Sequence, residues 1–295
     1  MTTMTNLIQT LISGLSLGSI YALIALGYTM VYGIAKMLNF AHGDVIMVGA
    51  YSGIVAVAQM GLSPWVTVIV SIVVCAVLGV VIEFCAYKPL RQAPPLSVLI
   101  TAIGVSYLLQ NAALLIFGSQ QMAYPTLVKL PGFSVGGVQV DGITVLTLAV
   151  TATLMAALTL FIDRTRLGKA MRAVSEDKDA ALLMGINTNR TISMTFAIGS
   201  ALAAIAGVLL CSAYPVLIPT TGSMPGIKAF TAAVFGGIGS IPGAMIGGIL
   251  LGVIEILGRA YISTQLSDAI VFSVLIIVLL VKPTGLLGKK ITEKV

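Results

Sequence analysis

The residues that could carry out chemistry are few, and the first candidates lie near the N-terminus. Gly14-Leu-Ser16-Leu-Gly18 matches the G-x-S-x-G pattern that presents a nucleophilic serine in many hydrolases. Such a serine needs a general base, and His42 is the only histidine in the chain. Because this pattern is also common in helices rich in Gly and Ser, close helix packing through Gly14 and Gly18 is the alternative to an intramembrane protease.

A second candidate group is Asn39, His42 and Asp44, which fall within six residues of one another. Ionisable groups inside a membrane often mark a transport pathway, so these side chains could line a translocation path or couple an ion. A structural alternative is an Asn cap and a His–Asp pair that stabilise the start of a helix. No His-x-x-x-His and no carboxylate cluster accompanies them, so the sequence predicts no metal site and no cofactor.

A third candidate is the stretch from Asp163 to Arg190, which holds ten of the 26 charged residues (16 basic plus 10 acidic). Ser175 is expected to cap a short helix, with Glu176 in its first turn and Gly185 at its left-handed end. Between these residues, small and flexible apolar side chains recur at helical spacing. This stretch could therefore dock a water-soluble partner.

Upstream in the same stretch, Arg166, Lys169 and Arg172 recur every third residue and so lie near one face of a helix. Long basic side chains at a membrane surface reach toward lipid headgroups. Residue types alone therefore also allow a solvated loop held by anionic lipid.

The rest of the chain has the composition of a helical membrane protein. Its 295 residues are 58% hydrophobic and 9% charged, whereas about a quarter of a soluble domain is charged. Long continuous apolar runs predict helices, because the strands of a barrel would alternate over about ten residues. The net charge of +6 favours contact with the lipid bilayer and not with nucleic acid, since no basic cluster lies beside an aromatic platform.

We therefore expect an all-α integral membrane protein: a single transmembrane domain over residues 1–295 with about seven full spans. The expected spans cover residues 7–33, 37–60, 65–86, 96–118, 143–162, 191–213 and 266–281. Residues 119–142 form an external loop with a small hairpin around Gly136-Gly137, and residues 163–190 form a cytoplasmic loop.

The orientation follows from the basic residues. Thirteen of the 16 lie on one side of these spans, at residue 36, in the links 88–91 and 163–190, and in the tail 282–294. The positive-inside rule makes that side the cytoplasm of a bacterial inner membrane, with the N-terminus outside and the C-terminus inside. Glu83 and Lys88 are expected to reach headgroups on this side. Glu255 and Arg259 are expected to pair at four-residue spacing.

This orientation requires residues 229–257 to cross the membrane an even number of times. Those 29 residues (257 − 229 + 1) are too few for two spans of about 20 residues each. We expect a re-entrant pair of half-helices that meet near Gly239, Ser240 and Gly243 and pack beside the translocation path. Glycines at four-residue spacing also allow close helix packing, which is the alternative role for this segment.

Four blocks of the chain resemble a known family. Asp179-Ala180-Ala181 followed by Gly185 resembles the EAA---G loop of ABC importer permeases, with Asp in place of Glu. The longer string RTRLGKAMRAV..D..AA...GIN is similar to the permeases of branched-chain amino-acid (LIV-type) importers. The other three similar blocks are NFAHGDVIMVGAY, FTAAVFGGIGSIPGAMIGGILLGVIE and KPTGLLG.

The resemblance implies a permease subunit that forms half of the translocation path of an importer for branched-chain or related amino acids. It implies a heterodimer with a homologous second permease, two ATP-binding subunits, and a periplasmic or extracellular binding protein. It also implies that the ATPase-coupling residues are Arg172, Glu176, Asp179, Ala180, Ala181 and Gly185.

The chain has no G-x-x-x-x-G-K-[ST] sequence, so we expect no ATPase site and no enzymatic activity of its own. Two alternatives remain for the function. One is an ABC permease for urea or short amides, and the other is an ion-coupled secondary transporter or channel that uses His42 and Asp44.

Overall fold

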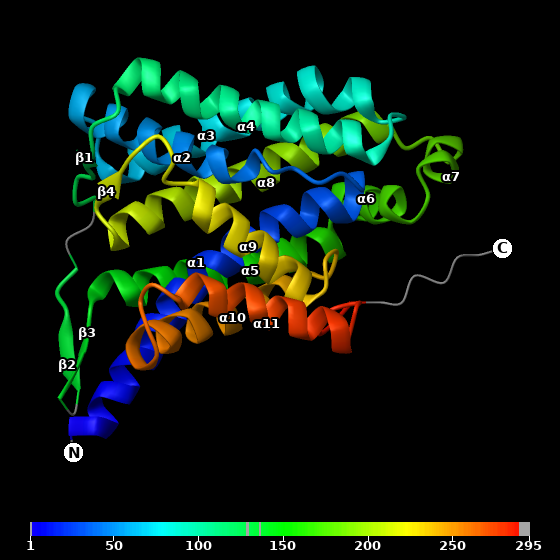
Figure 1. Ribbon diagram of the computed structural model, residues 1–295. Helices are drawn as coiled ribbons and strands as arrows, with labels where there is room; N and C mark the ends of the chain where they lie inside the picture. Colours follow the sequence, from blue (N-terminus) through cyan, green and yellow to red (C-terminus); the bar gives the residue numbers. More distant parts are fainter. Residues whose placement is uncertain (1, 128–129, 136, 289–295) are drawn as a thin grey trace.

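The computed structural model of the chain describes residues 2–127, 130–135 and 137–288. Helices dominate it and run roughly side by side along one axis (Figure 1). The first half contains α1 (Thr2–Ala35), α2 (His42–Ile54), η1 (Val55–Gln59), α3 (Pro64–Ile82), η2 (Glu83–Tyr87), η3 (Lys88–Leu90) and α4 (Pro95–Phe117). The second half contains α5 (Gly142–Arg164), α6 (Arg166–Glu176), α7 (Lys178–Leu183), α8 (Thr188–Ala213), α9 (Ser223–Gly236), α10 (Ile241–Tyr261) and α11 (Ser267–Val281).

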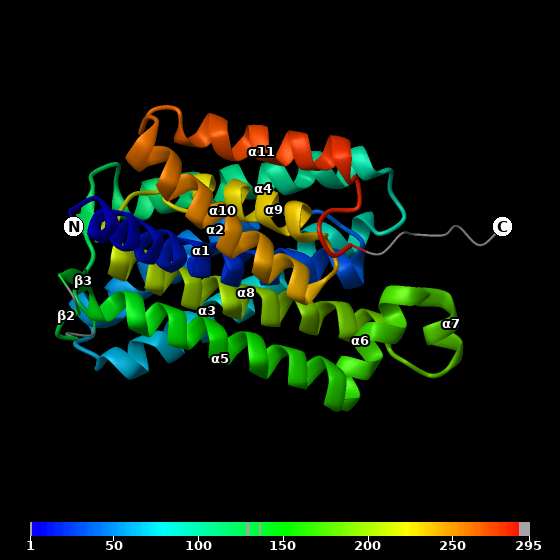
Figure 2. The same cartoon turned by 90° about the horizontal axis from the view of Figure 1, so that it is seen from below.

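Short strands pair at one end of the bundle. These are β1 (Met122–Ala123) with β4 (Val216–Leu217), and β2 (Phe133–Val135) with β3 (Val138–Val140), both antiparallel. The β2–β3 pair confirms the expected hairpin, although residue 136 in its turn lies outside the described residues. In both views the strands and the start of α1 lie at one end, and α6 and α7 at the other (Figure 1, Figure 2). We call these the strand end and the α7 end.

In the part of the chain that the structure describes, six helical segments are long and apolar enough to cross a membrane. They are α1, α3 with the turns that follow it, α4, α5, α8 and α10. The helix α11 is apolar but has only 15 residues. The expected all-α membrane bundle is therefore confirmed, while the exact number of spans stays a prediction.

The expected span over residues 37–60 is not one continuous helix. α1 ends before Lys36, which has a φ of 58°, and residues 36–41 are not helical. His42, the first residue of α2, lies against Gly27, which is eight residues (35 − 27) before the end of α1. Eight residues correspond to about 12 Å of helix, so α2 begins inside the bundle. The expected span did not show this break, because apolar residues continue from Met37 through most of the loop into α2.

Residues 229–257 fall within a helical hairpin whose arms differ from the expected half-helices. α9 has 14 residues, whereas α10 has 21 and could cross a membrane alone. The amides of Leu286 and Leu287, which follow α11, donate to the carbonyl oxygens of Phe235 and Gly236 at 2.9 Å, so the turn lies at the α7 end. The hairpin extends beyond residues 229–257 at both ends, which leaves room for the longer second arm. A re-entrant geometry stays unconfirmed.

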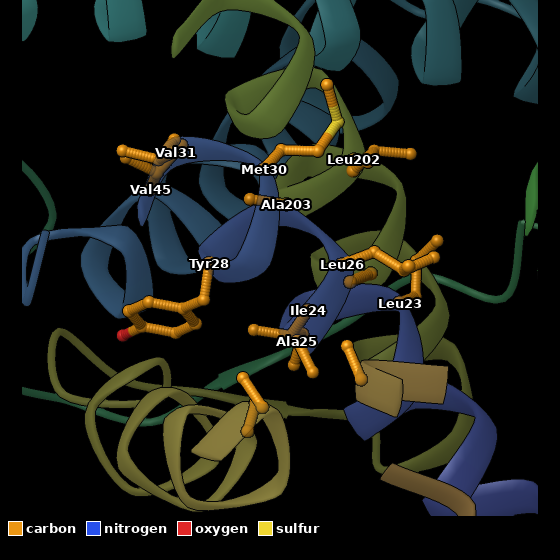
Figure 3. Close-up of a cluster of buried hydrophobic side chains, with 14 of the residues drawn as sticks. Leu23, Ile24, Ala25, Leu26, Tyr28, Met30, Val31, Val45, Leu202 and Ala203 are labelled. Atoms are coloured by element: carbon orange, nitrogen blue, oxygen red, sulfur yellow. The ribbon is translucent and has the colours of Figure 1, made fainter. Parts of the chain in front are cut away.

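α1 runs through the centre of the bundle. Figure 3 shows its middle turns beside Val45 of α2 and Leu202 and Ala203 of α8. Side chains around its circumference are fully buried there, including Ile20, Leu23, Ile24 and Leu26. A helix that is apolar on all sides belongs in the interior of a large bundle. α1 is therefore the element around which the others pack.

Glycines bring α1 and α10 into backbone contact. A methyl group at Gly252 would lie 2.2 Å from the Cα of Gly18, and one at Gly248 would lie 2.3 Å from the Cα of Ala22. A methyl group at Gly14 would lie 2.9 Å from the backbone of α10. Small residues at four-residue spacing permit this approach in lipid. Helix packing, the alternative role of the Gly14–Gly18 segment, is confirmed.

The helices α3, α4 and α5 lie at the sides of the bundle and expose apolar residues. On α4, Tyr107, Leu108, Leu115 and Ile116 are all exposed. A continuous apolar surface of this kind requires lipid or another protein chain against it. The sides of the bundle are thus suited to a bilayer or a partner subunit.

Candidate functional site

The helix α6 turns back across the end of α5 because of a cap and a glycine at the corner. The Thr165 hydroxyl accepts a hydrogen bond from the Gly168 amide at 3.0 Å and caps α6. A methyl group at Gly168 would lie 2.4 Å from the Cα of Ile162. Glycine is therefore required for this close return of the chain.

The expected basic face of α6 is present. Arg166, Lys169 and Arg172 are exposed, whereas Met171 is buried against the bundle. Arg172 forms an ion pair with Asp163 at the end of α5, and both side chains are more than half exposed. Exposed ion pairs contribute little to stability, so Arg172 remains available to other partners.

The short helix α7 starts later than the sequence suggested. Its cap is Asp177, whose carboxylate accepts hydrogen bonds from the amides of Asp179 and Ala180 at 2.9 Å. Ser175, the expected cap, lies in the last turn of α6 and donates to the carbonyl oxygen of Arg172 at 2.7 Å. Asp177 is preferred because hydrogen bonds from amides to a charged carboxylate are stronger than those to a hydroxyl.

The end of α7 agrees with the sequence. Gly185 has a φ of 81°, so it adopts the left-handed conformation that ends a helix. Glu176, Asp179 and Ala180 are exposed around α7, whereas Ala181 is buried and packs against the bundle. The residues expected to couple to an ATPase thus lie together on one projecting loop at the α7 end (Figure 2).

The tip of α7 carries an apolar patch, which includes Leu183 and Met184 from the apolar side chains that the sequence places at helical spacing in this loop. Leu182, Leu183 and Met184 are 59%, 89% and 82% exposed. They follow one another in a loop that is otherwise rich in charge. Exposed apolar patches rimmed by polar residues mark protein–protein or membrane contacts. We call these three residues the α7 tip.

The underside of α7 contacts the bundle through Lys178. Its ammonium group donates to the carbonyl oxygen of Ala35, the last residue of α1, at 3.0 Å. Partial burial lowers the pKa of Lys178, and the positive charges of Arg91 and Lys36 lower it further. A helix C-terminus carries partial negative charge, so the end of α1 attracts this ammonium group.

Glu83 and Arg91, both in the link between α3 and α4, form a largely buried ion pair that is hydrogen-bonded to α8, the helix just after α7. Arg91 donates to the Glu83 carboxylate and to the side-chain oxygen of Asn189. The Ser193 hydroxyl donates to the other Glu83 oxygen at 2.5 Å. Because Glu83 is 0% exposed, the expectation that it reaches lipid headgroups is wrong. Lys88 is exposed and lies over the ring of Phe84.

The link between α3 and α4 also contacts the loop that precedes α2. The Tyr87 hydroxyl donates to the side-chain oxygen of Asn39 at 2.9 Å, and its ring packs against Phe196 of α8. The expectation that Asn39 caps the following helix is wrong, because the residue at the cap position is Ala41 and makes no side-chain bond. The side-chain oxygen of Asn39 instead accepts the hydrogen bond from Tyr87.

His42 and Asp44 do not form the expected pair. The His42 ring is buried and packs edge-on against Tyr28, with 4.7 Å between ring centroids. A methyl group at Gly27 would lie 2.3 Å from His42 Nε2, so Gly27 makes room for the imidazole. Within the described residues, no hydrogen bond or ion pair joins His42 to Asp44.

Asp44 belongs to a polar cluster drawn from three helices. Its Oδ1 accepts a hydrogen bond from Gln110 Nε2 of α4 at 2.9 Å. The same nitrogen lies 3.2 Å from the hydroxyl oxygens of Ser106 and of Ser223, the first residue of α9. Sequence reasoning found Asp44 but not the other three, because neutral polar residues in separate apolar segments carry no local signal.

Gly239 and Ser240 lie in the turn between α9 and α10 at the α7 end, and Gly243 lies in the first turn of α10. The Ser240 hydroxyl caps α10 by accepting the Gly243 amide at 3.2 Å. Gly239 has a φ of 92° and lies against Gly33 near the end of α1. The six predicted path residues therefore form two separate groups, one inside the bundle and one at its α7 end.

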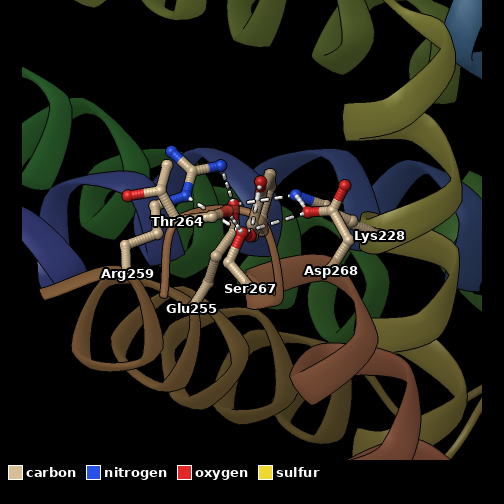
Figure 4. Close-up of polar contacts among 7 residues, drawn as sticks. Lys228, Glu255, Arg259, Thr264, Ser267 and Asp268 are labelled. Atoms are coloured by element: carbon tan, nitrogen blue, oxygen red, sulfur yellow. Dashed lines mark hydrogen bonds and ion pairs between the residues drawn. The ribbon is translucent and has the colours of Figure 1, made fainter. Parts of the chain in front are cut away.

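A second buried ion cluster joins α9, α10 and α11 (Figure 4). Glu255 forms ion pairs with Lys228 at 2.8 Å and with Arg259, and Lys228 also pairs with Asp268 at 2.6 Å. The predicted Glu255–Arg259 pair is confirmed. Tyr21 of α1 donates to the remaining Glu255 oxygen at 2.9 Å. Lys228 was not foreseen, since it lies 27 residues before Glu255.

The protease alternative finds no support in the geometry. Ser16 precedes Gly27, the α1 residue that touches His42, by eleven residues (27 − 16). That separation corresponds to about 16 Å along the helix. A serine nucleophile must lie within hydrogen-bond reach of its base, so these two residues do not form a catalytic pair.

An apolar helical bundle with one charged loop projecting from its end is the architecture of an integral membrane protein. The chain belongs to the family described as the permease component of branched-chain amino acid transport systems, whose model matches residues 10–279.

Two relatives show how close this likeness is. The chain is 50% identical to the high-affinity branched-chain amino acid transport system permease protein BraD of Pseudomonas aeruginosa, over 98% of each chain. It is 49% identical to the permease protein LivH of Escherichia coli (strain K12), over 98% of this chain and 97% of LivH.

Among solved structures, PsaBC from Streptococcus pneumoniae in complex with Fab is similar, with a TM-score of 0.50 and 15% identity. The match covers 92% of this chain and 91% of that one. At this level of identity the likeness concerns the fold alone.

Proposed function

We propose that this chain is the membrane-spanning subunit of an ATP-driven importer for branched-chain amino acids, and that it forms half of the translocation path. The relatives named above carry this activity in their names and match the chain over nearly its whole length. The coupling role is inferred from the α7 tip, an exposed apolar patch on a loop that projects from the bundle.

The proposal assigns the loop to an ATP-binding subunit. Residues 163–190 form the coupling loop, with Arg172, Glu176, Asp179, Ala180, Ala181 and Gly185 at or near the contact. The apolar tip supplies contact area, and the charges around it orient the partner. Movement of α7 reaches α1 through Lys178 and reaches the α3–α4 link through Asn189 and Ser193.

The rest of the proposed complex follows from the exposed surfaces. The apolar sides of α3, α4 and α5 face lipid and a homologous second permease, in a heterodimer served by two ATP-binding subunits. The chain has no ATPase site of its own. Residues 1–295 form one permease domain in the inner membrane.

A binding protein docks at the strand end, outside the membrane, where residues 119–142 form the external loop. The N-terminus lies on that side, and the C-terminus is cytoplasmic. The substrate path runs past Asn39, His42 and Asp44, and the turn at Gly239, Ser240 and Gly243 lies near its cytoplasmic end.

The test is a charge placed on the α7 tip. In the complete importer reconstituted in proteoliposomes, we expect Leu183→Asp to reduce ATP-dependent leucine uptake at least tenfold while the protein still inserts. Gln92→Asp, at an exposed position of the link between α3 and α4, is the matched control and should transport normally. Uptake by Leu183→Asp within twofold of the unsubstituted importer would refute the coupling role.

A further inference from the structure

Two helices of this bundle begin in its interior and meet there. α2 starts at His42 and runs toward the strand end, and α9 starts at Ser223 and runs toward the α7 end. Their first turns touch: a methyl group at Gly222 would lie 1.8 Å from the carbonyl oxygen of Gly43. Only glycines allow this contact. Asp44 and Ser223 therefore lie at the same depth, well inside the bundle.

The Asp44 carboxylate at this point lacks a cationic partner. It is 1% exposed, and its hydrogen bond from Gln110 is a bond from a neutral amide. No lysine, arginine or histidine in the described residues forms an ion pair with it, whereas the buried carboxylates Glu83 and Glu255 both have one. A buried charge is costly unless it is paired and hydrogen-bonded.

The surroundings of Asp44 match a primary ammonium group. Such a group has three N–H donors, and the cluster offers the carboxylate together with the hydroxyl oxygens of Ser106 and Ser223 as acceptors. In this structure the Gln110 Nε2 group, itself a donor, lies among these acceptors, 2.9 Å from Asp44 Oδ1 and 3.2 Å from both hydroxyl oxygens, so an ammonium group would take its place. Gln110 and Ser106 come from α4, a helix at the side of the bundle, which brings the cluster within one helix of the surface.

We propose that Asp44, Ser106 and Ser223, the three side chains that surround the Gln110 amide nitrogen, form a binding site for the α-ammonium group of an amino acid in transit, with the Gln110 amide giving way to it. This inference rests on the proposed function, because it takes the ammonium group to be that of an amino acid carried by the importer. The Asp44 carboxylate pairs with the ammonium charge and so compensates for the hydration free energy that this charge loses inside the membrane. The site contacts only the group that all α-amino acids share, so it does not select among their side chains.

The first test removes the charge and keeps the size. We expect Asp44→Asn to lower leucine uptake by the reconstituted importer at least tenfold, with assembly and ATP hydrolysis retained. Retained assembly and ATP hydrolysis serve as the control, because a variant that failed to fold would lose both. Uptake by Asp44→Asn within twofold of the unsubstituted importer would overturn the site. An unsubstituted importer that takes up no amino acid would instead overturn the proposed function.

The second test detects the negative charge of Asp44 through the rate at which charged reagents modify a nearby cysteine, and it does not depend on uptake. Ser223→Cys is introduced after the native Cys75, Cys85 and Cys211 have been replaced by alanine, and the importer is treated with cationic or anionic methanethiosulfonate reagents during turnover. We expect the cationic reagent to react at least fivefold faster, leucine to slow the reaction, and Asp44→Asn to abolish the preference. Equal rates for the two reagents, or no reaction at position 223, would contradict an ammonium site.

Discussion

Single residues decide where α7 begins and ends. Asp177 fixes its start through two amide hydrogen bonds, and the left-handed Gly185 fixes its end. The sequence predicted the role of Gly185, because few other residues tolerate a positive φ. It misplaced the start, since Ser175 and Asp177 are both good caps and the pattern does not show that Ser175 still belongs to α6.

Replacing Asp177 with alanine should destabilise α7 by about 1 kcal/mol, because both cap bonds are lost. Hydrogen exchange of the α7 amides in the assembled importer measures this, and an increase of roughly fivefold is expected. Ser175→Ala is the control, since the Ser175 hydroxyl bonds only a carbonyl oxygen of α6. Faster exchange in Ser175→Ala than in Asp177→Ala would reverse the assignment of the cap.

A second prediction about single residues concerns the glycines that allow close contact between α1 and α10. Gly248→Ala should destabilise the protein by about 1–3 kcal/mol, because the added methyl group would overlap the α1 backbone at Ala22. Gly104→Ala on α4 is the control, since nothing lies within 4 Å of its added methyl group. Thermal unfolding in detergent compares the two variants. An equal midpoint for both would show that α1 and α10 are not in close contact.

Among the elements, long apolar helices were predictable and interrupted ones were not. α1, α3, α4, α5 and α8 coincide with expected spans because each is an unbroken apolar run. α2 and α9 begin inside the bundle, and hydropathy does not show at what depth a helix begins. Their starts depend on long-range contacts such as Gly43 with Gly222, and no single segment contains that information.

A prediction for these elements concerns the ion pair of Glu83 and Arg91, through which the α3–α4 link is hydrogen-bonded to α8, the helix that follows α7. Glu83→Ala should destabilise the importer by about 3 kcal/mol, because Arg91 would be left buried without its partner. Glu83→Gln keeps the shape and some hydrogen bonds, so it should fold while the fraction of ATP hydrolysis that drives uptake falls severalfold.

The ratio of leucine taken up to ATP hydrolysed in proteoliposomes measures this effect. Lys88→Gln, in the same link but exposed, is the control. An unchanged ratio in Glu83→Gln would mean that the ion pair only stabilises the fold.

At the scale of the whole molecule, charge and hydropathy agree with the architecture. Charged residues gather in the loop 163–190, part of which projects at the α7 end (Figure 2). Exposed apolar side chains lie on the helices at the sides of the bundle. The sequence predicted this division because it depends on composition alone. It did not predict that the path residues separate into an interior group and a group at the α7 end, since their spacing in the chain says nothing about depth.

The coupling role of α7 is tested most directly by a photo-reactive residue at position 183, at the α7 tip, in the assembled importer. We expect illumination to cross-link this chain to the ATP-binding subunit, with a yield that changes when ATP is added. The same residue at position 139, in the β2–β3 hairpin, should not capture that subunit. An importer that transports leucine while position 183 cross-links to nothing, or only to lipid, would contradict the coupling role.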